Sequence, residues 1–87
     1  MIARMWEARV APGRLADAEH WVTEVLLRSA LDAGAAGAEA FRADGEDPRV
    51  VAITRWASEP AWTEPAPDDA LVVRAHAWRF EELGPAQ

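Results

Sequence analysis

The sequence lacks cysteine, lysine and asparagine entirely. Without cysteine, neither disulfide bonds nor thiolate metal sites can stabilise the fold. All nine basic residues are arginine and fifteen residues are acidic, which gives a formal net charge of −6. The sequence contains no stripe of basic residues, so binding to nucleic acid through its phosphates is not expected.

Long hydrophobic runs are also missing. No stretch approaches the roughly 20 apolar residues that cross a bilayer as a helix. The first ten residues carry Arg4, Glu7 and Arg9 where a secretory signal peptide needs an apolar stretch. The sequence has no glycine-rich phosphate loop and no nucleotide-binding fingerprint. We therefore expect a soluble, cytoplasmic protein that binds neither a membrane nor a dinucleotide.

Large apolar side chains are few. The chain has 87 residues, enough for one domain, and 51% of them are hydrophobic. Twenty of these are alanine, and only 24 bring a larger apolar side chain. A chain of this size buries only about 60–65% of its unfolded surface. So thin a core needs further support, and we expect it from association into a homodimer.

Periodicity and turn residues predict six elements along the chain. Apolar side chains at Leu15, Ala18 and Val22 recur at helical spacing, and Gly34 is a natural helix end. The predicted elements are a strand over 1–10, a helix from 14 to the stop at 34, strands over 36–43 and 49–57, a short helix from 58 and a strand over 71–83. A turn over 44–48 joins the two middle strands into a hairpin, and 84–87 form a tail.

The second helix is expected to be short. Ser58 is a suitable N-cap, and Pro60 fits in the first helical turn. Pro65 and Pro67 then interrupt the helix, because proline lacks the backbone N–H that a helix interior needs. We expect at most one or two helical turns between Ser58 and Asp69, followed by irregular chain.

The order of the elements predicts the fold. Strand–helix–strand–strand–short helix–strand is the ferredoxin-like βαββαβ order of an α+β domain, here over residues 1–83. Right-handed crossovers place both helices on one face of a four-stranded antiparallel sheet. The opposite face stays bare unless it meets another sheet. We therefore expect two copies of the chain to associate through this face.

Two stretches of the sequence resemble a known family. One is 1–6 (Met-Ile-Ala-Arg-Met-Trp), followed by Pro12 and Gly13 at the start of the helix. The other is 53–59, a strand that ends in tryptophan, one further residue, serine and an acid. Both resemble the antibiotic-biosynthesis-monooxygenase-like family. The resemblance implies a dimeric α/β barrel, in which two ferredoxin-like sheets pack face to face, with a pocket in each subunit between the sheet and its helices.

The resemblance also implies two activities. One is the cofactor-independent oxygenation of polycyclic phenols to quinones, and the other is haem degradation. The haem-degrading members use an asparagine, a tryptophan and a histidine. This sequence has no asparagine, and Trp6 stands where that asparagine is expected. The shortened second helix also removes the segment for the other two residues, so the resemblance favours the oxygenase activity.

Four residues are candidates for such a site. Arg4 and Trp6 share one face of the first strand, while Trp62 lies in the short helix and His76 in the last strand. Under the oxygenase hypothesis Arg4 holds the phenolate, the two indoles clamp the ring, and His76 accepts the phenolic proton. Each residue also has a structural interpretation. Arg4 would then pair with a nearby acid, the two indoles would fill the core, and His76 would make a structural hydrogen bond.

No metal or cofactor is expected in the site. His20 and Glu24 lie one helical turn apart, which is a weak pair and frequent on solvated helix faces. The expected partners are a second copy of the chain and a small flat aromatic molecule. Two hypotheses on function follow. The protein is a cofactor-independent monooxygenase of an aromatic, polyketide-type phenol, or a non-catalytic dimeric α/β barrel that binds a small hydrophobic ligand or serves as an accessory protein.

Overall fold

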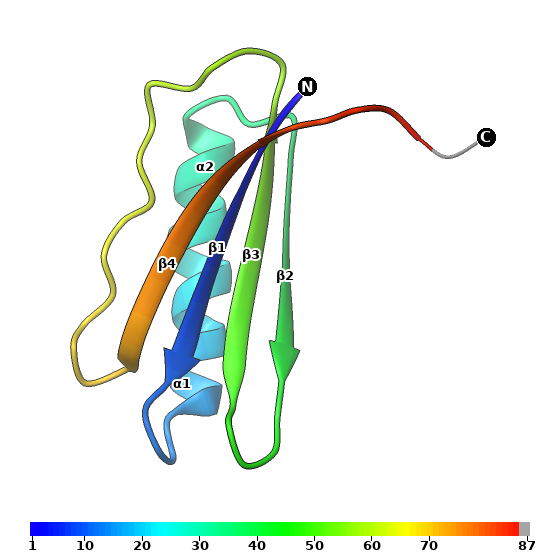
Figure 1. The fold of residues 1–87 in the computed structure, drawn as a ribbon. Helices are drawn as coiled ribbons and strands as arrows, with labels where there is room; N and C mark the ends of the chain where they lie inside the picture. Colours follow the sequence, from blue (N-terminus) through cyan, green and yellow to red (C-terminus); the bar gives the residue numbers. More distant parts are fainter. Residues whose placement is uncertain (86–87) are drawn as a thin grey trace.

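The computed structural model describes residues 1–85, which form one sheet and one long helix (Figure 1). The strands are β1 (Ile2–Val10), β2 (Gly37–Ala43), β3 (Arg49–Trp56) and β4 (Val72–Glu81). The helix runs continuously through α1 (Leu15–Trp21), the π-helical segment η1 (Val22–Leu27) and α2 (Arg28–Asp32). The strand order is β2-β3-β1-β4, with all neighbours antiparallel. The fold is therefore α+β, with a four-stranded open sheet that is compatible with the ferredoxin-like fold.

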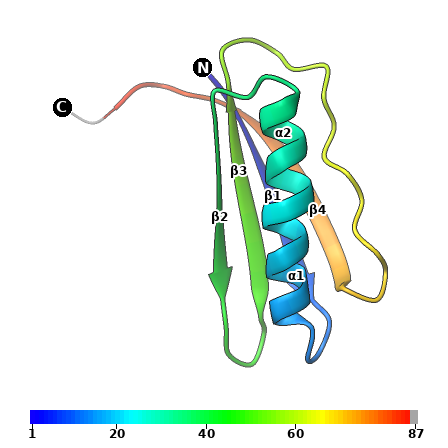
Figure 2. The ribbon, with the colours of Figure 1, turned by 180° about the vertical axis from the view of Figure 1, so that it is seen from behind.

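The helix covers one face of the sheet (Figure 2). Alternation along β1 and β3 turns every second residue toward the helix, because successive side chains of a strand point to opposite faces. The buried cluster between the two layers consists of Trp6, Ala8, Val10, Ala18, Val22, Leu26, Val50 and Ala52. Three of these eight residues are alanine, so the core of one chain is as thin as the composition predicts.

The other face of the sheet carries no covering element within residues 1–85 (Figure 1). The strand register places Met5 of β1 between Ile53 of β3 and Trp78 of β4 on this face. Phe41 and Phe80 lie nearer its borders and are about half exposed. We call this surface the open face; its apolar members are Ala3, Met5, Phe41, Val51, Ile53, Trp78 and Phe80. The same face carries the ion pairs Arg49–Glu7 and Arg55–Glu39, and beside them the apolar members form a contiguous strip that is characteristic of an interaction site.

The second helix predicted from Ser58 is absent. Residues 57–71, which we call the strap, run irregularly beside the long helix from the end of β3 to the start of β4 (Figures 1 and 2). The predicted helix start is wrong, because Ser58 and Pro60 are only local signals and Pro65 and Pro67 interrupt the chain soon after them, whereas the predicted irregular chain before Asp69 is confirmed. Within the strap one backbone hydrogen bond forms, from Leu71 N–H to the carbonyl of Asp68, at 2.9 Å. Side chains therefore hold most of the strap in place.

The remaining elements begin and end within two residues of their predicted limits. The last strand, for example, is predicted over 71–83 and found at Val72–Glu81. Of the predicted tail, residues 84–85 follow β4 without regular structure, and 86–87 lie outside the described residues. Among the helices of residues 1–85, none combines the length and the apolar composition needed to span a bilayer.

Gly34 follows the helix with a left-handed backbone, at φ +103°. An alanine at this position would be strained, although its Cβ would meet no atom within 4 Å. We expect Gly34→Ala to lower the free energy of unfolding by about 1–2 kcal/mol, as measured by chemical denaturation. Gly37→Ala is the matched control, because its Cβ also meets open space but its φ lies outside the left-handed region. Equal stability of the two variants would contradict this account of the helix end.

Candidate functional site

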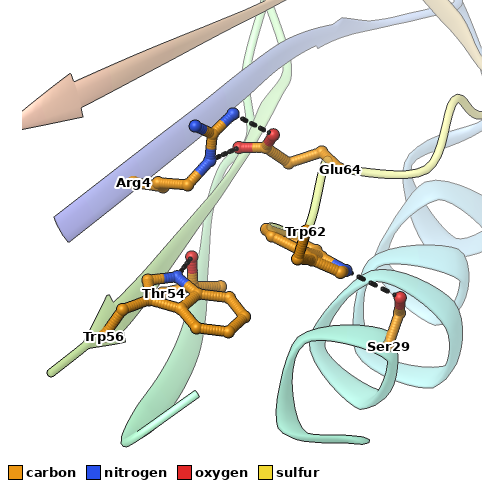
Figure 3. Close-up of polar contacts among 6 residues, drawn as sticks. All are labelled: Arg4, Ser29, Thr54, Trp56, Trp62 and Glu64. Atoms are coloured by element: carbon orange, nitrogen blue, oxygen red, sulfur yellow. Dashed lines mark hydrogen bonds and ion pairs between the residues drawn. The ribbon is translucent and has the colours of Figure 1, made fainter. Parts of the chain in front are cut away.

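Arg4 forms a two-pronged ion pair with Glu64 of the strap (Figure 3). Its Nε lies 3.2 Å from Oε2 of Glu64, and its Nη2 lies 2.6 Å from Oε1. The side chains of Arg4 and Glu64 are 19% and 6% exposed, so the pair is largely shielded from water. Two parallel charge-assisted hydrogen bonds are the strongest arrangement between a guanidinium and a carboxylate. Arg4, which the oxygenase hypothesis assigns to phenolate binding, is therefore already paired with the carboxylate of Glu64.

Trp6 lies in the core rather than on an accessible wall. It is 4% exposed, and its ring centre is 5.7 Å from that of Trp21 on the helix. A ring buried to this extent presents almost no surface on which a ligand can stack. The geometry thus favours the core-filling interpretation of Trp6, and its role as a clamp stays a prediction.

Trp62 joins the strap to both layers of the protein. Its ring centre lies 5.2 Å from that of Trp56 on β3, with the planes tilted by 33°. Its indole N–H donates to Ser29 Oγ on the helix, at 2.9 Å, and the indole N–H of Trp56 donates to Thr54 Oγ1, also at 2.9 Å (Figure 3). The packed rings of Trp56 and Trp62, whose indole N–H groups are both hydrogen-bonded, fill the space between β3 and the helix near Ser29.

The ring of His76 lies on the side of the sheet away from Arg4. The register pairs His76 with Glu7 of β1, which is three residues from Arg4 and so points to the opposite face. The imidazole centre is 5.8 Å from that of Trp78, on the open face. The structure therefore brings Arg4 and the two candidate indoles to one side of the sheet and leaves the imidazole on the other. Within one protomer, His76 is not placed to accept a proton from a phenol bound at Arg4.

A small groove lies between the strap and β4. It has a volume of about 270 Å³ and is lined by Arg4, Trp6, residues 63–67 of the strap and residues 75–77 of β4. Pockets that enclose drug-sized ligands span roughly 300–1,000 Å³. The groove is therefore too small to enclose a polycyclic phenol while the strap stays in place.

Two polar residues of this site do not stand out in the sequence. Glu64 lies 60 positions from Arg4, and Ser29 lies 33 positions from Trp62, so local patterns do not pair them. One signal was available for Glu64: it is the single acid of residues 60–67, a stretch with three prolines. Because a carboxylate in an apolar segment is buried only with a partner, such an acid indicates a distant cation.

Most other arginines form ion pairs that are at least partly exposed, on the helix, on the strands or in the hairpin turn. Arg9 and Arg49 both contact Asp47 in the hairpin turn, at 2.7 and 2.6 Å. The hydrogen bond from Arg49 lowers the pKa of Asp47 from its ordinary value, because it favours the charged carboxylate. Exposed pairs of this kind add little to stability. We therefore assign them to the surface of the single chain and not to a binding site.

Metal ligands do not gather in the described part of the chain, where no three His, Asp or Glu side chains form a group that could hold an ion. The fold and the site together define an α+β protein whose sheet and helix enclose tryptophan rings and a shielded Arg–Glu pair. No family model matches the sequence, and the search of curated proteins finds no match. The resemblance to the antibiotic-biosynthesis-monooxygenase-like family therefore stays a prediction from the residues that suggested it.

Proposed function

We propose that the protein acts as a homodimeric α/β barrel and serves as a non-catalytic binding or accessory module. The observation that carries the proposal is the filled space around Arg4, between the strap and the sheet. Arg4 is bound to Glu64, and Trp6 is 4% exposed. An oxygenase of polycyclic phenols needs room for the ring system and a free group for the phenolate. Neither is present beside Arg4 while the strap holds its position.

The open face supports the dimeric part of the proposal. Its central row consists of Ile53, Met5 and Trp78, and the last of these is 42% exposed in one chain. Two sheets that pack face to face, about 10 Å apart, remove both apolar faces from water. The thin core of a single chain then gains a second layer, which is the support that a domain of this size needs.

A cofactor-independent oxygenase is the second candidate. It is supported by Arg4 and Trp6, which line the groove of about 270 Å³, and by Trp62, which lies on the same side of the sheet. In this reaction an anthrone reduces O₂ itself, since its CH₂ group becomes the quinone C=O and the second oxygen atom leaves as water. The strap would have to lift, and a base other than the imidazole of the same protomer would have to take the phenolic proton.

Oxygen uptake separates the two candidates. We expect purified, chelator-treated protein to consume no O₂ with a dihydroxyanthrone above the rate without protein. Saturable quenching of tryptophan fluorescence by the same compound supports a binding module, and no quenching supports an accessory role. Protein-dependent uptake that Arg4→Ala abolishes would contradict the proposal and establish the oxygenase. Arg14→Ala is the control, because Arg14 forms an exposed pair with Asp17 far from the groove.

A further inference from the structure

The strap is attached to the rest of the protein mainly through side chains. Between residues 57 and 67 its backbone makes no hydrogen bond to other backbone groups in the described chain. Three side chains hold this part: Glu59 bonds to Arg79, Trp62 contacts Trp56, and Glu64 bonds to Arg4. A segment without a backbone ladder opens at a lower free-energy cost than a helix or strand. The strap is therefore the element that lifts most easily from the sheet.

Two strap side chains contact the sheet in one compact place. Trp62 and Glu64 are two residues apart, so an extended chain directs both to the same side (Figure 3). The indole of Trp62 lies on that of Trp56, and the carboxylate of Glu64 receives two hydrogen bonds from Arg4. Arg4 and Trp56 sit on adjacent strands and on the same face of the sheet. An aromatic ring and a carboxylate thus occupy neighbouring positions on the sheet.

An anionic aromatic ligand can make both of these contacts by itself. When the strap lifts, Arg4 loses the carboxylate of Glu64 and the indole of Trp56 loses the ring of Trp62, so both groups are left without their partners. A ligand carboxylate restores the charge-assisted hydrogen bonds, and its ring restores the contact with the Trp56 indole. Glu64 competes with the ligand from within the same chain, at a high effective concentration. The groove beside Arg4 gives the ligand a point of entry.

We infer that Arg4 and Trp56 form a binding site for a planar aromatic carboxylate, which the strap occupies through Glu64 and Trp62 when no ligand is bound. The inference deepens the proposed binding role and rests on it, because it names the class of ligand. The dimer does not depend on it, since these four side chains lie on the helix-covered side and the open face lies opposite.

Calorimetric titration with 2-naphthoate tests this assignment. We expect Glu64→Gln to bind 2-naphthoate at least about tenfold more tightly than the wild type, because the competing charge is gone. The neutral 2-naphthamide should gain nothing from the substitution, and Arg4→Gln added to Glu64→Gln should remove the gain. Glu24→Gln is the control, since it removes an exposed carboxylate of the long helix, bonded to Arg28 at 3.3 Å, that does not hold the strap. It should leave the affinity unchanged.

Equal affinity of Glu64→Gln and wild type for 2-naphthoate would overturn the inference, as would an equal gain for 2-naphthamide. Should Glu64→Gln fail to fold, the wild type provides a second test by NMR. The indole N–H of Trp62, which donates to Ser29 in the free protein, should shift on addition of 2-naphthoate, while that of Trp21 should not. An unmoved Trp62 signal at the solubility limit of the ligand contradicts the site. None of these results depends on the oligomeric state, so a negative result here can be told apart from a finding that the protein is a monomer.

Discussion

Replacing Trp6 by alanine should unfold much of the protein at temperatures where the wild type is folded. Trp6 is 4% exposed, and its ring contacts that of Trp21 across the two layers. Removing a buried tryptophan side chain costs about 3–5 kcal/mol, because the cavity that remains closes only in part. For 87 residues, the whole free energy of unfolding is about 4–13 kcal/mol. Thermal unfolding followed by circular dichroism measures the loss directly.

Trp6→Phe is the control for this experiment. Phenylalanine keeps a ring against Trp21, so this variant should retain the fold and lose less stability than Trp6→Ala. The clamp interpretation of Trp6 predicts another pattern, in which Trp6→Ala folds normally and only the binding of an aromatic ligand weakens. Unchanged thermal stability of Trp6→Ala would therefore refute the assignment of Trp6 to the core.

A charge on the open face should separate the two protomers of the proposed dimer. Trp78 is 42% exposed in one chain, so the isolated protomer tolerates Trp78→Glu. Twofold symmetry would bring two such glutamates into one interface, where each loses its water. We expect the dimer dissociation constant to rise by about a thousandfold or more. Sedimentation equilibrium over a range of protein concentrations measures the change.

Val25→Glu provides the comparison. Val25 is also 42% exposed, but it lies on the long helix and not on the open face. The same charge at this position should leave the dissociation constant within a factor of about two of the wild-type value. Equal dissociation by both variants would indicate that added charge, and not its place on the open face, disrupts the assembly.

The regular elements could be predicted because their signals are local. Alternation along β1 and β3, and the helical spacing from Leu15 onward, are properties of neighbouring residues. The π-helical segment could not be predicted from such spacing. It contains Thr23, whose hydroxyl donates to the carbonyls of Glu19 and His20, at 3.0 and 3.1 Å, and such bonds compete with the regular helix ladder.

The site depends on contacts that the sequence does not pair. Alternation correctly predicts that Arg4 and Trp6 share one face of their strand. It also predicts that His76 shares a face with Trp78, but not which face of the sheet this is. Only the strand register shows that Arg4 and Trp6 lie on one side of the sheet and His76 on the other. Glu64 reaches Arg4 because residues 60–67 do not form a helix, and no local pattern pairs two residues that lie 60 positions apart.

The mass of the wild-type protein in solution tests the central claim most directly. Open faces that pack together require a dimer, whatever ligand the protein binds. Light scattering after gel filtration, at micromolar protein, should give twice the 9.5 kDa of one chain. A mass of 9.5 kDa across the accessible concentration range would contradict the dimeric barrel and leave the open face of the sheet without the partner assigned to it.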